Sequence, residues 1–128
     1  MAQLLRERRF EDLDLENVAE EIESLGKEQV HALQSQLRRL LKHLLKHQFQ
    51  PAKRTGSWRG SMASARIEIE GNLEVNPSLK PRIENLMQRA YLAAVKEAMA
   101  ETGLPNKTFP TACPWTFEQA MQDDFFPE

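Results

Sequence analysis

A run of apolar residues at helical spacing, with no proline before Pro51, constrains this chain more than any other feature. The positions recur at steps that are mostly three or four: Leu15, Val18, Ala19, Ile22, Leu25, Val30, Leu33, Leu37, Leu40, Leu41, Leu44 and Leu45. This period places the side chains on one face of a helix. We expect the helix to start at an N-cap on Asp14 and to reach about Gln48. Gly26 could divide it, and we favour one continuous helix.

Two further helical patterns follow Pro51, whose ring cannot continue the hydrogen-bond ladder of the first helix. Apolar steps of three and four predict a second helix across residues 58–73. Asn76 and Pro77 suit the start of a third helix, because a proline at the first position lacks only a donor that would stay unpaired. Gly103 is typical of a helix end. These patterns predict an all-α antiparallel bundle of three or four main helices.

The last 25 residues hold four prolines and also five of the nine aromatic residues of the chain. Thr116 and Gln119 fit a capping box, which predicts a short terminal helix to about Gln122. We expect residues 103–128 to form an aromatic strap across the bundle that buries Trp115 and Phe117. Residues 1–13 form an N-terminal segment in this interpretation, and residues 1–128 form a single helical domain.

Composition excludes several classes of protein. The only cysteine, Cys113, allows neither an intramolecular disulfide nor a four-cysteine zinc site, which favours a reducing cytoplasm. No apolar stretch approaches the length of about eighteen residues that a membrane helix needs. A glycine-rich phosphate loop is also absent from the sequence, so we expect no cofactor.

Charge is strongly segregated along the chain, although the formal net charge is only −2. Residues 1–28 hold nine acidic and four basic residues, and residues 68–128 hold ten and five, so each end carries −5. Residues 29–67, the central segment, hold no acidic and eight basic residues. Such a segment favours a binding surface for nucleic acid or for an acidic protein. The alternative is that the folded ends neutralise it.

The candidate binding residues follow from this segment and from the loop after the first helix. They are Arg39, Lys42, Lys46, Lys53, Arg54, Ser57, Trp58, Arg59 and Arg66. Helical spacing sets the lysines and arginines of the first helix opposite its leucines, which predicts that they point to water or to a partner. The oligomeric state stays open, and a homodimer is allowed.

Two pairs in the first helix have the spacing of reactive sites. His43 and His47, four residues apart, share a helix face as in two-histidine metal sites, but no third ligand lies nearby in sequence. Arg38 and His43 form an Arg-x4-His spacing similar to the signature of the higher eukaryotic and prokaryotic nucleotide-binding family of helical ribonucleases. That resemblance implies metal-independent RNA cleavage. Cys113 has no histidine near it in sequence, so a buried inert thiol is favoured over a nucleophile.

Several blocks of sequence resemble the domain of unknown function 29 family, which is common in cyanobacteria and some other bacteria. These blocks are residues 13–17, 20–26, 43–51, 113–116 and 125–128, together with Arg54, Ser57 and Trp58. The resemblance implies a small all-helical protein with no established activity. Members often begin further upstream, which implies that part of the first helix is missing or replaced here. They also tend to carry an aromatic residue at the place of His47, which argues against a metal pair.

Arg54, Ser57, Trp58 and Arg66 match the family and form a polar group beside the loop after the first helix. If Arg66 is buried it needs a carboxylate, and Glu70 or Glu20 could supply one. The group either locks the loop to the core or binds an anion. We therefore expect a small binding module that uses the basic central segment. The alternatives are a ribonuclease that uses Arg38 and His43, and a regulatory protein of the toxin–antitoxin type.

Overall fold

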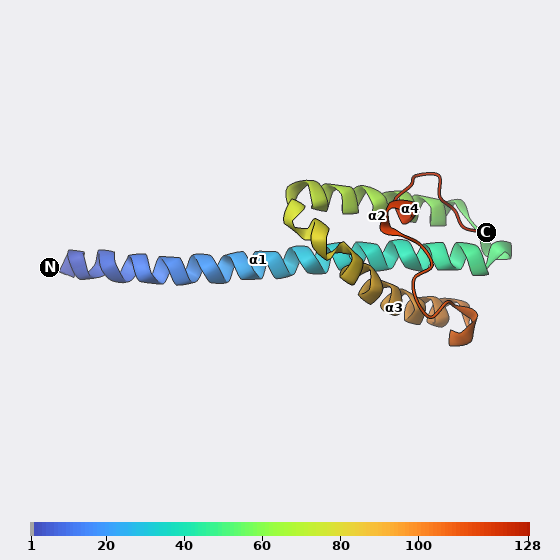
Figure 1. Cartoon of the computed structure of the whole chain (residues 1–128), viewed down its shortest axis with the longest axis horizontal. Coiled ribbons are helices and arrows are strands. Elements are labelled where there is room, and N and C mark those ends of the chain that lie inside the picture. The colour runs from blue at the N-terminus through green and yellow to red at the C-terminus, as the bar shows by residue number, and fades with distance from the viewer. Residues whose placement is uncertain (1) are drawn as a thin grey trace. The chain divides into compact units, whose positions relative to one another are not determined.

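The computed structural model describes the backbone of residues 2–128 and the side chains of residues 26–128. Four α-helices form the chain: α1 (Ala2–Phe49), α2 (Gly56–Val75), α3 (Ile83–Thr102) and α4 (Phe117–Ala120) (Figure 1). Three short 3-10 helices, η1 (Pro51–Lys53), η2 (Pro77–Arg82) and η3 (Asn106–Thr108), lie between them. No strand occurs in residues 2–128. The prediction of an all-α fold is confirmed.

Helix α1 is longer than the apolar pattern indicated. It begins at Ala2, so the prediction of an N-cap at Asp14 is wrong. Neither proline nor glycine precedes Gly26, and residues 2–9 are mostly good helix formers, so nothing local ends the helix before Asp14. The helix continues through Gly26, as predicted. The chain divides into two units, of which the first ends at His31 and the second spans Ala32–Glu128.

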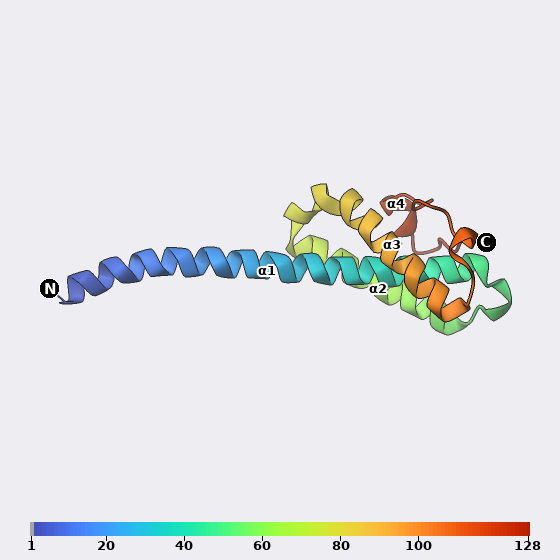
Figure 2. The ribbon, with the colours of Figure 1, turned by 90° about the horizontal axis from the view of Figure 1, so that it is seen from below.

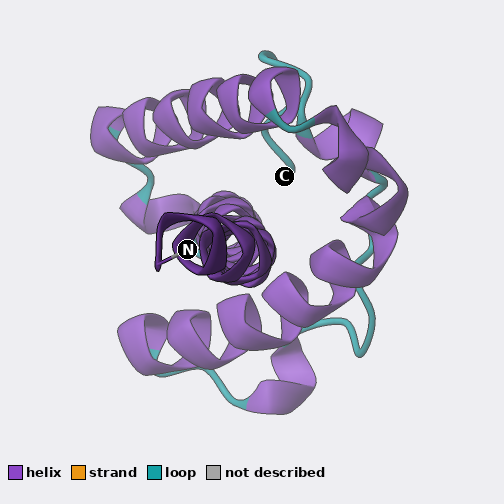
Figure 3. Cartoon of the chain, turned by 90° about the vertical axis from the view of Figure 1, so that its left-hand side faces the viewer, coloured by secondary structure: helices purple, strands orange, loops and turns teal. Residues whose placement is uncertain are grey.

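The core of the second unit lies between α1, α2 and α3. Helix α2 returns antiparallel to α1, and α3 runs back on another side of it (Figures 1 to 3). Six leucines in the part of α1 that belongs to this unit have no exposed surface: Leu33, Leu37, Leu40, Leu41, Leu44 and Leu45. The facing stripes are Met62, Ala65, Ile69 and Leu73 on α2, and Leu86, Ala90, Ala94 and Ala98 on α3. Each fully buried leucine stabilises the fold by ~2 kcal/mol, so this contact dominates the second unit.

Local signals place the ends of the later helices. Thr55 is the N-cap of α2, but its side chain makes no cap hydrogen bond. Gly103 follows α3 with φ 74°, the left-handed conformation that glycine adopts without steric cost. Thr116 Oγ1 accepts a hydrogen bond from the backbone N–H of Gln119, which starts α4. The helix then ends at Ala120, earlier than predicted.

The C-terminal segment, residues 103–128, contacts all three long helices through a few aromatic and polar groups. Phe109 packs edge-on against Phe49 of α1, with ring centroids 5.3 Å apart. Trp115 is buried, whereas Phe117 is half-buried. The C-terminal segment therefore contributes buried aromatic side chains to the part of the chain formed by residues 26–128. Among the residues that the structure describes, no helix has an apolar stretch long enough to cross a membrane.

Candidate functional site

Three basic residues of α1 form ion pairs with α3. Arg38 Nε lies 2.7 Å from Glu97 Oε1, and Lys46 Nζ lies 3.4 Å from Glu101 Oε1. Lys42 Nζ lies between both carboxylates, 3.3 Å from Glu97 Oε2 and 3.2 Å from Glu101 Oε2. The side chains of Lys42 and Lys46 are only 17% and 13% exposed. These lysines were predicted to point to water or to a partner. Two carboxylates one turn apart on α3 lie opposite them, which is the alternative in which an acidic end neutralises the segment.

This cluster perturbs two titratable groups. Partial burial raises the pKa of Glu101, but hydrogen bonds and charge from Lys42 and Lys46 outweigh it and leave the pKa below the ordinary value. Burial lowers the pKa of His43, and the two lysine charges lower it further. The Nδ1–H of His43 donates to the carbonyl of Arg39, at 2.8 Å. His43 is therefore a neutral ring at neutral pH, bound to its own helix.

The remaining basic residues of the central segment differ in exposure. Arg39 turns toward α2, where its Nη1 lies 3.4 Å from Ser64 Oγ. The same Nη1 lies 3.4 Å from Gln36 Oε1 of α1. Lys53 and Arg59 are exposed, on η1 and on the first turn of α2. Within residues 26–128 neither takes part in an ion pair. These two side chains are the accessible part of the predicted basic surface.

Arg54, Ser57 and Trp58 lie at the corner between α1 and α2. The Nε–H of Arg54 donates to the carbonyl of His47, at 2.7 Å, and so satisfies one of the last carbonyls of α1. Ser57 Oγ lies 2.6 Å from Thr55 Oγ1. Trp58 is half-buried. Arg54 thus joins the loop to the end of α1, which is the structural role proposed for this group.

Arg66 of α2 is buried and holds the end of the chain. Its Nε–H donates to the carbonyl of Ala120 at 2.9 Å, Nη2 donates to Phe125 at 2.8 Å, and Nη1 donates to Asp123 at 3.3 Å. The side chain is 2% exposed. Three carbonyls of one short segment therefore converge on a single guanidinium, whose fork geometry allows several hydrogen bonds at once.

The predicted carboxylate partners of Arg66 need correction. Glu70 is exposed and makes no ion pair within residues 26–128, and the side chain of Glu20 lies outside the described residues. Burial lowers the pKa of Arg66, and the nearby charges of Asp123 and Asp124 oppose this effect. Main-chain carbonyls replace the expected ion pair because they too can accept from a buried guanidinium. Their positions depend on how the C-terminal segment packs, which residue spacing does not reveal.

A second set of contacts surrounds the ring of Phe126, and we call His47, Arg59 and Arg66 the cradle. The Cζ atoms of Arg59 and Arg66 lie 4.6 Å and 5.7 Å from the ring centroid of Phe126. The ring of His47 lies 5.7 Å from it, centroid to centroid. The Nδ1–H of His47 donates to the carbonyl of Pro127 at 2.7 Å. The cradle therefore combines two guanidiniums and one imidazole around one aromatic ring.

The predicted reactive pairs do not assemble into sites. His43 and His47 direct Nδ1 to different carbonyls, and no three His, Cys, Asp or Glu side chains gather in the described part of the chain in a way that could hold a metal. Arg38 is committed to Glu97, while His43 is bound to the α1 backbone. The two side chains of the Arg-x4-His spacing thus have separate partners.

The pKa values of Tyr91, which is buried, and of Cys113, which is half-buried in the C-terminal segment, are raised. Burial raises the pKa of Tyr91 to about 12, and the neighbouring Cys113 adds to the shift. The hydroxyl of Tyr91 donates to the carbonyl of Pro110 at 2.6 Å. Burial also raises the pKa of Cys113, whose Sγ lies 3.4 Å from the carbonyl oxygen of Trp115. A thiol with a raised pKa is a poor nucleophile, as expected for an inert cysteine.

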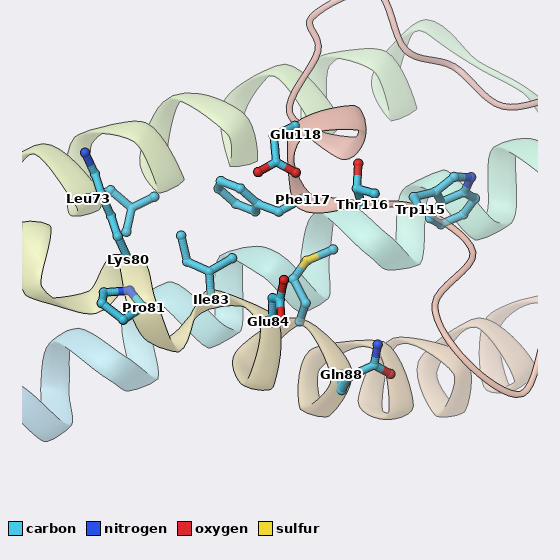
Figure 4. A pocket seen from close by; sticks show the side chains of 11 residues that line it. Leu73, Lys80, Pro81, Ile83, Glu84, Gln88, Trp115, Thr116, Phe117 and Glu118 are labelled. Atoms are coloured by element: carbon cyan, nitrogen blue, oxygen red, sulfur yellow. The ribbon is translucent and has the colours of Figure 1, made fainter.

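A cavity of about 690 Å³, which sequence patterns did not reveal, lies between the end of α2, the start of α3 and residues 115–118 (Figure 4). Its walls include Leu73 and Ile83. The charged side chains of Lys80, Glu84 and Glu118 also line it. It lies outside the basic segment, and its mixed lining selects no particular ligand.

The folded second unit is an all-helical bundle in which three of the eight basic residues of the central segment form ion pairs with α3. Residues 1–126 match the family described as domain of unknown function DUF29. The chain belongs to this family, as the sequence blocks indicated. No curated protein and no solved structure matches the chain.

Proposed function

We propose that the protein is an interaction module that binds an acidic segment of a partner protein at the corner between α1 and α2. The observation that carries this proposal is the exposure of Lys53 and Arg59. Both are cations of a segment without acidic residues, and both lie outside the ion pairs with α3. An acidic segment would gain favourable charge interactions there without displacing an existing pair.

The number of available cations favours a protein partner over nucleic acid. Nucleic acids are held by many phosphate contacts, each of which needs a cation or donor. Arg38, Lys42 and Lys46 already face carboxylates, and Arg66 is buried. A short acidic segment needs only a few cations. The ring of Trp58 would add apolar contact beside these cations. Lys46 Nζ lies 4.8 Å from the centroid of this ring and holds the ring at the corner.

Charge reversal at Lys53 tests the proposal. The probe is a fluorescent glutamate-rich peptide, titrated at low and at high salt with the full chain. We expect Lys53→Glu to weaken binding about three- to fivefold at low salt, because an exposed charge contributes ~0.5–1 kcal/mol. Lys96→Glu, an exposed reversal on α3, is the matched control and should bind as the unaltered protein does.

A single-stranded RNA of equal length is titrated in parallel. Tighter binding of the RNA, with a steep loss of affinity as salt rises, would replace the acidic protein with nucleic acid as the partner. Equal binding of the peptide by the two charge-reversed variants would contradict a role for this corner. Absence of peptide binding at low salt would remove the proposal altogether.

A further inference from the structure

The ring of Phe126 lies beside two guanidiniums that would interact more strongly with an anion than with the ring. A guanidinium gains less from an aromatic face than from a charge-assisted hydrogen bond to an anion. The nearest cation, Arg59, lies 4.6 Å from the ring centroid, and Arg66 lies 5.7 Å from it. Within residues 26–128 neither guanidinium forms an ion pair. Two positive charges thus surround a neutral ring.

His47 supplies an independent indication. Its side chain is 3% exposed, and its Nδ1 must carry hydrogen because the carbonyl of Pro127 can only accept. In the neutral ring, Nε2 is therefore an acceptor. Within the described residues this buried atom has no hydrogen-bond partner. A hydrogen-bond donor that reaches Nε2 would satisfy it.

Another hydrogen-bond acceptor could replace the carbonyls of the C-terminal segment that bind Arg66. Arg66 has five N–H donors, and three main-chain carbonyls near the chain end engage it. If the segment left, the buried guanidinium would lose these acceptors at considerable cost, unless an anion replaced them. The segment and an anion are thus alternative partners for the same donors.

We propose that the ring of Phe126 fills a phosphate site formed by His47, Arg59 and Arg66, and that the C-terminal segment and a phosphate group are alternative occupants. The guanidiniums match the oxygens of a phosphate. Hydrogen phosphate and the monoanion of a phosphomonoester each keep one hydroxyl, which can donate its hydrogen to Nε2 of a neutral His47 ring. Sulfate at neutral pH has no such hydrogen. The site shares Arg59 with the proposed site for an acidic partner, but the test of that partner at Lys53 changes no residue of the cradle.

Removal of the ring in the full chain tests this site. Isothermal titration with inorganic phosphate should show that Phe126→Ala binds about tenfold more tightly than the unaltered protein, a change equal to ~1.4 kcal/mol. Phe126→Leu, which keeps part of the bulk, should give a smaller gain and provides the measurement if the alanine variant does not fold. Phe117→Ala removes an equal ring from the same segment away from the cradle, and should bind as the unaltered protein does.

Three comparisons decide the outcome. The double variant Phe126→Ala, Arg59→Met should lose the gain, since Arg59 is exposed and its replacement leaves the core intact. Sulfate should bind Phe126→Ala more weakly than phosphate. Phosphoserine that binds more tightly than free phosphate would identify a phosphomonoester as the natural source, and the reverse order would identify free phosphate. The proposal is overturned if Phe126→Ala gains no affinity, if the double variant keeps the gain, or if sulfate binds as well as phosphate.

Discussion

Arginine residues of this chain carry the same charge but differ in burial and in the groups that they bind. Arg38, 44% exposed, pairs with Glu97 near the surface. Arg59 is exposed, and Arg66 is buried beneath three carbonyls. The cost of burying a charge predicted that a buried Arg66 needs a carboxylate, and backbone carbonyls accept its hydrogen bonds instead. The identity of the acceptors was not predictable, because backbone carbonyls carry no signature in the sequence.

The single tyrosine allows a test of burial at the residue scale. Burial raises the pKa of Tyr91 from 10.0 to about 12, so the folded state keeps the phenol proton to higher pH than the unfolded state does. Between these values the unfolded state binds fewer protons, and the free energy of unfolding should fall as pH rises. Tyrosinate absorbance reports this group alone, and its midpoint should lie well above 10.0.

Tyr91→Phe provides the comparison. The variant lacks the hydrogen bond to Pro110 and should be ~1 kcal/mol less stable near neutral pH. It should also lose less stability than the unaltered protein between pH 10.0 and about 12. A tyrosinate midpoint at the ordinary value, with the protein still folded, would show that the hydroxyl is accessible to water.

At the scale of elements, helix α1 has two faces that were predictable to different degrees. Its leucine face follows from the period of the sequence alone, and all six leucines from Leu33 to Leu45 are fully buried. Its basic face was predicted to lie opposite the leucines and to point to water or to a partner, and carboxylates of α3 lie opposite three of its cations. Lys46 and Glu101 are 55 residues apart, and only the packing of α3 on α1 brings them together.

A charge exchange between α1 and α3 tests this pairing. Lys42→Glu places a third carboxylate beside Glu97 and Glu101 and should lower the free energy of unfolding by ~1 kcal/mol or more, since Lys42 is largely buried. Glu101→Lys alone should also destabilise, because it faces Lys42 and Lys46. The double exchange should restore part of the loss, and urea unfolding measures all four proteins.

Salt provides the control for this cycle. The coupling energy between positions 42 and 101 should shrink as salt rises, because part of each side chain remains exposed and is screened. Additive losses in the double exchange at low salt would mean that the two side chains do not interact in solution.

At the scale of the whole molecule, the buried groups of the described residues belong to the second unit, Ala32–Glu128. The C-terminal segment contributes to it through Trp115, Phe109 and the carbonyls that Arg66 binds. This unit contains the six buried leucines of α1 and the two helices, α2 and α3, whose apolar stripes face them.

We expect a fragment of residues 32–128 to fold without residues 1–31. It should unfold in one cooperative transition in urea, with near-ultraviolet circular dichroism from Trp58 and Trp115. Cooperative unfolding is expected because each of the three long helices buries its apolar stripe against the others. A fragment with helical circular dichroism but without a cooperative transition would show that the second unit needs the first.

Spacing along the chain was sufficient to predict the helices, the buried leucine face and the family, because helix period, prolines and glycine ends act over a few residues. Long-range packing determined which cations stayed exposed and which group satisfied Arg66. Those contacts join residues more than fifty positions apart, as Arg66 and Ala120 do. Burial and ion pairing depend on the distance between side chains in space, so equal charges in one segment came to lie in a core, an ion-pair cluster and an open corner.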